Sequence, residues 1–334
     1  MPEADLGGFD SAYHAPVMWR EVLEIFSASS GVVVDGTLGG GGHTAALLSG
    51  NQALAVIAID RDPVAIDFAS GRLAEFGQRA ELRRASFRDL DEVLADDGVR
   101  EWMADRPLAG GLFDLGVSSR QLDDPSRGFS FREAGPLDMR MDAATGLNLA
   151  EYLRQVDEAV LARAIAENGE PRHARILARR IKQAMAGGRL TTTADLREVV
   201  AEVVGRAYAG RRIDPATKVF QALRIEVNEE MEALEELLEK IPAVFAPPAR
   251  VCVISYHSGE DQRVKRAFAE MTEGGCRCPK DLPCVCGAQV VARRLGGMRR
   301  PQEDEVSANP RARSAKLRAI EMIEPIAVAE LRGL

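Results

Sequence analysis

The sequence predicts an α/β fold in which a Rossmann-like parallel sheet carries an inserted helical domain. Three observations lead to this prediction. Short apolar runs recur in the first third of the chain, and each ends near a polar or aromatic residue. A run of glycines follows the first of them. Residues 119–218 contain no strand-like run and show helical spacing instead. Continuous apolar runs are typical of parallel strands, because both faces of a parallel sheet are covered.

The glycine-rich loop after the first predicted strand is the most informative segment. Val32–Val34 fit a buried strand that ends in Asp35, and five glycines follow within residues 36–42. Glycines in this position let the backbone turn sharply and approach a ligand closely. The dinucleotide spacing G-x-G-x-x-G is met only loosely, and no phosphate-binding Lys is present. A tight connection that binds no ligand is the alternative interpretation.

The second predicted strand, at residues 55–60, ends in an acid. Asp60 lies about 20 residues beyond the glycine-rich loop, where a ribose-binding carboxylate is found in nucleotide-binding sheets. An acid at this point can instead cap the next helix, but Asp62 is the better cap because Pro63 suits the first helical turn. Asp60 is therefore predicted to be available to a ligand.

Two more strands are expected at residues 80–86 and 111–114, and they lead to Phe87 and Asp114. Open α/β sheets bind ligands at the carboxyl ends of their strands, so these residues should line one crevice with Asp60. Two acidic strand ends would repel a diphosphate. A ligand with a ribose, an adenine and a cationic centre suits such an edge, and S-adenosylmethionine has all three.

The middle of the chain is expected to be helical and relatively basic. Residues 119–218 hold 17 Lys and Arg against 14 Asp and Glu, in a chain whose net charge is −8. Helices are predicted at 149–153, 157–167, 172–185 and 193–208, the last with a capping start at Thr192. Several basic side chains of the third helix share a face that could contact phosphates. The basic residues of this helix are Arg172, Arg175, Arg179, Arg180 and Lys182. A solvated helix face is the alternative interpretation.

The sheet is expected to resume after this insertion. An apolar stripe at helical spacing predicts one long helix over residues 217–241. Strands are predicted at 250–255, 289–293 and 317–323, the last two as a terminal hairpin-like pair. The expected organisation is a first part of the sheet domain at 1–118, a helical insertion at 119–218 and a second part of the sheet domain at 219–334.

Composition favours a cytosolic, cytoplasmic enzyme. There is no stretch of 18 apolar residues and no charged segment followed by an apolar core, so neither a membrane span nor a secretory signal is expected. Four of the five cysteines crowd between residues 276 and 286, which is not a distributed disulfide framework. Four thiols suit tetrahedral zinc, but the pairs are spaced C-x-C rather than C-x₂-C. A structural zinc site and a reduced loop both remain open, and no metal ligand is assigned.

Taken together, the motifs resemble the RsmH/MraW family of bacterial methyltransferases. The resemblance rests on long, irregular polar segments spread over nearly the whole chain, which are 14–18 (HAPVM), 35–44 (DGTLGGGGHT), 58–63 (AIDRDP), 114–123, 127–131 (RGFSF), 135–142 (GPLDMRMD), 220–230, 255–261 and 309–318 (NPRARSAKLR). It implies a class I methyltransferase sheet and S-adenosylmethionine-dependent methylation of the N4 amino group of a cytidine in 16S ribosomal RNA. The implied partner is that RNA or the small ribosomal subunit. Whether the chain forms a homodimer is left open.

The resemblance also implies roles for individual residues. Those matching the family's cofactor contacts are Gly41, Gly42, His43, Asp60, Phe87, Asp114 and Gln121. Amino-group methyltransferases commonly follow this fourth-strand acid with Pro-Pro and an aromatic residue, and here both prolines and the aromatic are missing. Asp138 and Asp114 are therefore the candidate catalytic acids, with Asp114 the stronger candidate for contacting the cofactor. Phe129 and Phe131 could stack on a splayed-out base or anchor a loop in the core.

Two other functions remain as alternatives. The enzyme could methylate a different RNA base or a DNA base, because the missing Pro-Pro-aromatic motif leaves the nucleophile weakly specified. The chain could also be a cofactor-sensing RNA-binding module without catalysis. That second alternative would need a damaged loop or pocket, and the sequence shows none.

Overall fold

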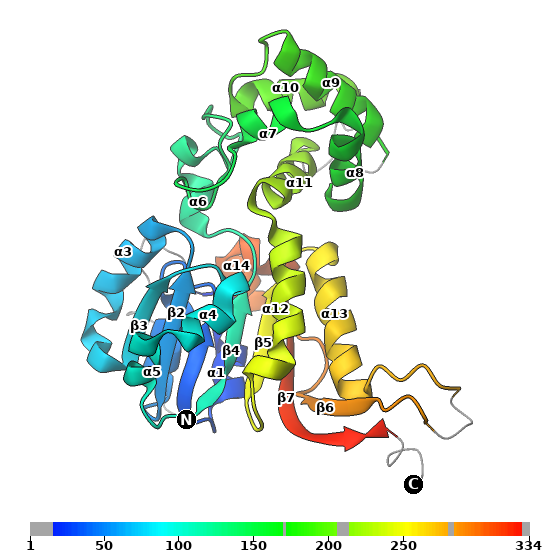
Figure 1. The fold of residues 1–334 in the computed structure, drawn as a ribbon. Helices are drawn as coiled ribbons and strands as arrows, with labels where there is room; N and C mark the ends of the chain where they lie inside the picture. The colour runs from blue at the N-terminus through cyan, green and yellow to red at the C-terminus, as the bar shows by residue number, and fades with distance from the viewer. Residues whose placement is uncertain (1–15, 170–171, 206–213, 280–283, 329–334) are drawn as a thin grey trace. The chain divides into compact units, whose positions relative to one another are not determined.

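A computed structural model describes residues 16–169, 172–205, 214–279 and 284–328. The chain divides into two compact units (Figure 1). The first, called here the sheet unit, comprises Met1–Gly116 and Glu232–Leu334. The second, called the helical unit, is the intervening segment Val117–Met231. None of the helices in the described part of the chain is long and apolar enough to cross a membrane.

The sheet unit contains one seven-stranded sheet in the order β3-β2-β1-β4-β5-β7-β6. The strands β1 to β5 are parallel, and β7 runs antiparallel between β5 and β6. This arrangement confirms the predicted Rossmann-like sheet and its late reversal. The strands are β1 Gly31–Asp35, β2 Leu54–Asp60, β3 Ala80–Arg84, β4 Leu108–Asp114, β5 Arg250–Ser255, β6 Gln289–Arg294 and β7 Lys316–Ala327.

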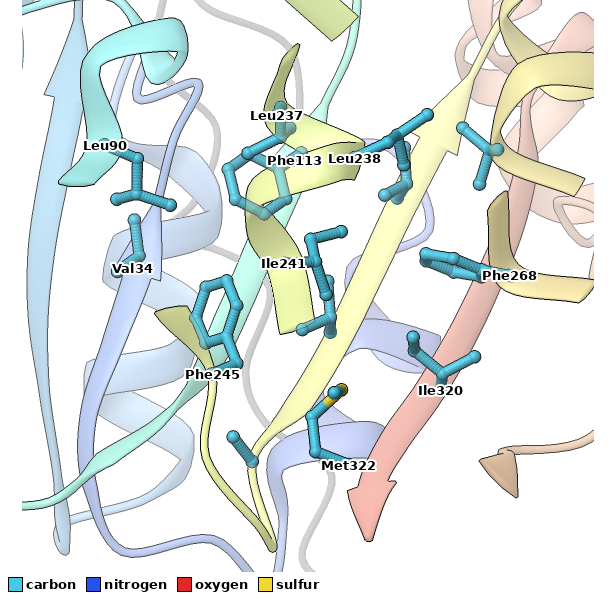
Figure 2. Close-up of a cluster of buried hydrophobic side chains, with 14 of the residues drawn as sticks. Val34, Leu90, Phe113, Leu237, Leu238, Ile241, Phe245, Phe268, Ile320 and Met322 are labelled. Carbon is cyan, nitrogen blue, oxygen red and sulfur yellow. The ribbon is translucent and has the colours of Figure 1, made fainter. Parts of the chain in front are cut away.

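Helices cover both faces of the sheet, which explains why the strands have no polar alternation. Val32 and Val34 of β1 join the cluster on one face, with helices α4, α5, α12 and α13, whereas Val33 joins the cluster on the other face, with α1, α2 and α3. Figure 2 shows the first cluster, in which Phe113 of β4 lies near α12. The bounds are α1 Trp19–Phe26, α2 Gly42–Gly50, α3 Pro63–Leu73, α4 Leu90–Ala95, α5 Asp97–Met103, α12 Glu230–Val244, α13 Ser258–Glu273 and α14 Glu303–Ala308.

The helical unit has a separate hydrophobic core. Leu161 and Ile165 of α8, Ile181 of α9 and Phe220 of α11 are among its buried members. The predicted capping start is confirmed, since the Thr192 hydroxyl accepts a hydrogen bond from the backbone N–H of Asp195. The helices are α6 Ser119–Asp123, α7 Leu149–Gln155, α8 Glu158–Asn168, α9 Ala174–Ala186, α10 Thr193–Val204 and α11 Ala216–Asn228. The end of the helix predicted at 193–208 lies partly outside the described residues.

The single long helix predicted over residues 217–241 is wrong. The chain forms α11 and α12, with a break at Glu229, whose backbone is left-handed with φ at 50°. Asn228 explains the break. Its side-chain oxygen accepts from the Met141 N–H at 2.7 Å, and its amide nitrogen donates to the Met139 carbonyl at 2.7 Å. A two-point ion pair between Arg224 and Glu230 spans the break, at 2.7 and 2.8 Å.

Candidate active site

Polar side chains from several strands meet at the edge of the sheet where the parallel strands end. Asp35 ends β1, Asp60 ends β2, Asp114 ends β4 and Tyr256 directly follows β5. The strands are neighbours in register, since Asp35 pairs with Ala58 and Asp114 pairs with Ile254. All four side chains belong to the sheet unit. The predicted gathering of acids at one edge is therefore present.

Asp60 holds the glycine-rich loop in place. Its two carboxylate oxygens accept hydrogen bonds from the backbone N–H groups of Gly39, at 2.8 Å, and Asp62, at 2.9 Å. Asp62 caps α3 by accepting from the Val64 N–H at 3.0 Å, which confirms the predicted assignment of the cap. Burial raises the pKa of Asp60 to about 6. Because each carboxylate oxygen has two acceptor positions, Asp60 keeps capacity for a further donor such as a ribose hydroxyl.

Asp35 and Thr37 tie the start of the loop to helix α2 and strand β4, a role that the sequence did not reveal. Asp35 is buried, and its oxygens accept from the Thr44 hydroxyl at 2.7 Å and the Thr37 N–H at 3.2 Å. The Thr37 hydroxyl accepts in turn from the Asp114 N–H at 2.7 Å. Burial raises the pKa of Asp35. These bonds fix the start of the loop against β4.

The helix α2 begins directly after the glycines. Gly41 is its N-terminal cap, with a left-handed backbone at φ 73°, where a side chain would be strained. The next helical residue after Gly42 is His43, which is only 5% exposed. Neither imidazole nitrogen has a hydrogen-bond partner among the described residues, and Nε2 lies 3.5 Å from Asp114 Oδ2. A buried imidazole of this kind is expected to have a partner, which a ligand can supply.

The side chain of Asp114 is held by Tyr256, a residue that the sequence did not indicate. The Tyr256 hydroxyl donates a 2.8 Å hydrogen bond to Asp114 Oδ1, which leaves Oδ2 toward His43. Burial, together with the charge of Asp114, raises the pKa of Tyr256 well above its usual value, so the phenol remains a donor. The signal that could have identified Tyr256 is its position at the end of the fifth strand, at the same edge as the acids.

An aromatic pair lies beside the loop. Phe87 begins a short 3₁₀ turn after β3, and its ring packs edge-to-face with Phe113 at a centroid distance of 6.3 Å. A Cβ on Gly36 would stand 2.5 Å from the Phe113 ring and 3.3 Å from the Cβ of Phe87. The absence of a side chain at Gly36 therefore lets the loop pass close to both rings.

Gln121 and Asp138 belong to the helical unit and already have local partners. Gln121 is buried and completes a capping box with Ser118, whose N–H donates to Gln121 Oε1 at 2.9 Å. Asp138 forms a two-point ion pair with Arg140, at 2.7 and 3.0 Å. Partial burial acts to raise the pKa of Asp138, but the hydrogen bonds from Arg140 outweigh it and the pKa is lowered.

The two phenylalanines proposed for base stacking pack inside the helical unit. Phe129 is buried, and the ring of Phe131 lies 4.9 Å from that of Phe220, edge-to-face. The side chain of Arg197 lies over the Phe131 ring at 5.8 Å. The structure therefore favours the alternative in which these rings anchor their loop in the core.

The basic residues selected on the third predicted helix differ in their surroundings. Arg172, Arg175 and Arg179 are exposed, although Arg172 precedes α9 rather than lying in it. Lys182 is engaged differently, since its ammonium donates to three carbonyls at the end of α7, at 2.7 to 3.1 Å. It therefore caps α7 and is removed from the candidate phosphate-contacting surface.

The sheet order, the late antiparallel strand and the acidic edge beside a glycine-rich loop define a Rossmann-like methyltransferase fold. A model of the MraW methylase family matches residues 11–323, and the chain belongs to this family.

Three similar proteins carry the name ribosomal RNA small subunit methyltransferase H. The protein from Anaeromyxobacter sp. (strain K) is 45% identical, over 93% of this chain and 98% of its own length. The protein from Trichlorobacter lovleyi is 44% identical over 93% of this chain and 98% of its own. The protein from Sorangium cellulosum is 46% identical over 92% of this chain and 90% of its own length.

Proposed function

We propose that this protein transfers a methyl group from S-adenosylmethionine to the N4 amino group of a cytidine in 16S ribosomal RNA. The observation that carries the proposal is the meeting of Asp60, Asp114 and the unpartnered imidazole of His43 beside a glycine-rich loop, in a chain of the MraW methylase family. The substrate class follows the name shared by its relatives. The protein acts in the cytoplasm, on the RNA or on the small ribosomal subunit.

The cofactor site is assigned residue by residue. Gly41, Gly42 and His43 hold the methionine portion of the cofactor, where the buried imidazole gains a hydrogen-bond partner. Asp60 accepts from the ribose hydroxyls with the acceptor positions that Gly39 and Asp62 leave free. Phe87 lies against the adenine. Asp114 completes the contacts from the sheet unit, and the acidic edge suits the positive charge of a sulfonium. The role of Gln121 as a cofactor contact rests on the family resemblance alone.

The reaction requires positioning more than acid-base chemistry. When bound, the cofactor supplies an electrophilic methyl group for an in-line displacement, so the chain mainly has to orient donor and acceptor. The cytosine N4 is a weak nucleophile because its lone pair is delocalised into the ring. An acceptor for one of its hydrogens would localise that lone pair and later remove the proton.

Asp114 and Asp138 are the proposed acceptors, with different constraints. Tyr256 holds one oxygen of Asp114 and leaves the other at the donor edge, which suits a contact to the cofactor. Both oxygens of Asp138 are paired with Arg140, which keeps it ionised and fixed in direction. Oδ1 already accepts from both the backbone N–H and the Nε–H of Arg140, whereas Oδ2 accepts one bond and retains a free position for an amino group. We assign Asp138, or a backbone carbonyl, to the base and Asp114 to the cofactor.

RNA is proposed to bind the helical unit. Arg172, Arg175 and Arg179 present exposed guanidinium groups around α9, and Ile176 between them is 55% exposed. Contacts between guanidinium groups and phosphates add affinity and position the protein on the RNA without regard to sequence, whereas the sequence is recognised through contacts to the bases. Whether the chain forms a homodimer stays open, and sedimentation of the purified chain would decide it.

The test is methyl transfer from a labelled cofactor to three acceptors, namely small ribosomal subunits, naked 16S RNA and duplex DNA. The subunits and the RNA should come from cells that lack the modification. Label in either RNA-containing acceptor, and none in DNA, supports the proposal. Label only in DNA favours the alternative substrate. Cofactor binding without transfer to any acceptor would favour the non-catalytic module.

A further inference from the structure

Four cysteine side chains converge in the loop that joins α13 to β6, residues 274–288. Their Sγ atoms all lie within 4.8 Å of one another. Cys276 is 3.3 Å from Cys284, Cys284 is 3.4 Å from Cys286, and Cys286 is 3.6 Å from Cys276. Cys278 is the fourth member, and all four thiols are free of disulfide bonds. The pairs are spaced C-x-C, yet both cysteines of each pair point to one place.

These separations match the edge of a thiolate tetrahedron. A Zn–S bond of about 2.3 Å places the four sulfurs of a tetrahedral site about 3.8 Å apart. A pair of disulfides would instead need two separations of about 2.05 Å. A cluster of several iron atoms would need its thiolates farther apart, since the metal atoms and sulfides lie between them. The arrangement therefore fits one ion at the centre of four sulfurs.

The backbone around the cluster is also arranged for thiolates. The backbone N–H of Cys278 donates to the Cys276 sulfur, and the N–H of Ala288 donates to the Cys286 sulfur. Each donor is two residues beyond its acceptor, and Gly287 between the second pair has the positive φ, 69°, that such a turn favours. Charge-assisted bonds of this kind stabilise a sulfur that carries negative charge.

We propose that Cys276, Cys278, Cys284 and Cys286 bind one structural zinc ion. Four thiolates in a closed tetrahedron are typical of structural zinc, which keeps no open position for substrate. A site of this kind also binds Zn²⁺ more tightly than Fe²⁺, and Zn²⁺ is not redox-active, which suits a structural role.

The position of the cluster in the fold explains what the ion does. The helix α13 leaves the edge that carries Asp114 and Tyr256, and β6 runs parallel to β5, so the loop between them lies at the opposite edge of the sheet (Figure 1). Cys284 packs there with Val290 of β6 and Val328 after β7 in a small satellite core. A zinc ion would hold the loop against the terminal β6–β7 pair and would take no part in methyl transfer.

The experiment is a metal count on the full-length protein purified under reducing conditions without chelator. We expect about one zinc ion per chain by inductively coupled plasma mass spectrometry, and no stoichiometric iron. The double variant Cys276→Ser/Cys284→Ser should lose the metal. The matched control is Cys252→Ala, which removes the remaining cysteine, buried in β5 away from the cluster, and should keep the zinc.

A second measurement protects the test against misfolding of the double variant. Cys286 is exposed, so Cys286→Ser should fold and yet release zinc during dialysis against a chelator that the wild type withstands. Replacement of the ion with Co²⁺ should give the absorption bands of a tetrahedral thiolate site in the wild type. Reduced protein that takes up neither Zn²⁺ nor Co²⁺, bound iron in place of zinc, or two disulfides found in freshly purified protein would each overturn the proposal. The metal count does not depend on methyl transfer, so its failure is distinguishable from failure of the proposed function.

Discussion

Replacement of Asp60 by Asn should weaken cofactor binding without a matching loss of folding stability. In the proposal Asp60 accepts from the ribose hydroxyls, and in the structure it also accepts from the N–H groups of Gly39 and Asp62. Hydrogen bonds to a charged group contribute about 1.5–3 kcal/mol. The variant should therefore bind S-adenosylmethionine about 12- to 150-fold more weakly, a cost of about 1.5–3 kcal/mol.

The stability of the protein without cofactor responds differently, because the Asp60 carboxylate is costly to ionise. Its pKa rises from 3.8 to about 6, which corresponds to about 3 kcal/mol against the charged form at neutral pH. Asn removes that cost but loses one of the two side-chain oxygens that accept from the backbone N–H groups of Gly39 and Asp62, which costs about 1.5–3 kcal/mol. The two effects offset, and the free energy of unfolding at pH 7 should change by less than about 2 kcal/mol.

The direction of the pH dependence follows from the same pKa. Because the folded value lies above the unfolded value, the protonated acid contributes stability that is fully present below pH 3.8 and is lost as the pH rises through about 6. Cofactor binding has the opposite trend, since ribose hydroxyls donate to the carboxylate. Affinity should therefore fall below pH 6 and be about tenfold lower at pH 5 than at pH 7. The Asn variant should not show this step.

The assay is calorimetric titration of cofactor at pH 5 to 8, together with chemical unfolding at pH 7. Asp62→Asn is the matched control, because it changes the adjacent acid, retains the oxygen that caps α3 and should keep near-wild-type affinity. Unchanged affinity in a folded Asp60→Asn protein would refute the ribose assignment. A loss of unfolding free energy clearly larger than about 2 kcal/mol would instead show that Asp60 mainly holds the loop.

Three further predictions concern the nucleophile and the RNA. Tyr256→Phe removes the donor to Asp114 and should lower kcat/KM on the order of tenfold at unchanged fold stability, as steady-state kinetics and thermal unfolding would show. Asp138→Asn should lower kcat with little effect on cofactor affinity, and more strongly than Arg140→Gln; equal losses would mean that only their ion pair matters. Combined replacement of the exposed Arg172, Arg175 and Arg179 should weaken RNA binding and leave cofactor affinity unchanged. The slope of log K for RNA against log salt concentration should become shallower by about 2–3, and an unaltered slope would show that the three arginines are ordinary surface charges.

The sheet could be predicted from the sequence because its signals are local. Each parallel strand is an apolar run with a polar residue at its end, and the topology brings those ends to one edge whatever else the chain does. Asp60 and Asp114 follow from this rule alone. The same rule would have included Tyr256, which follows the fifth strand, had aromatic hydroxyls been considered as partners for an acid.

The break between α11 and α12 could not be predicted in the same way. The apolar stripe continues through Glu229 without interruption. The helix ends where the Asn228 side chain accepts from the Met141 N–H and donates to the Met139 carbonyl, backbone groups nearly 90 residues earlier in the chain. Partners so distant in sequence leave no periodic signal. The ion pair of Asp138 with Arg140 joins residues only two positions apart in the sequence. Spacing alone, however, does not show that the guanidinium and the carboxylate contact each other.

The cysteine loop shows the limit of spacing rules. C-x-C pairs differ from the common zinc spacing, and the sequence therefore left two interpretations open. Only the positions of the four sulfur atoms, all within 4.8 Å, distinguish a common centre from a loose loop.

The proposed function requires the acidic edge of the sheet to present a methyl donor to the exocyclic amine of a cytidine. Its most direct test is to methylate unmodified small ribosomal subunits or 16S RNA with a deuterated donor, digest the RNA to nucleosides and identify the labelled product by chromatography and mass spectrometry against isomeric standards. We expect a single labelled nucleoside, N4-methylcytidine. Label on the cytosine ring carbon, on the ribose or on another base would contradict it.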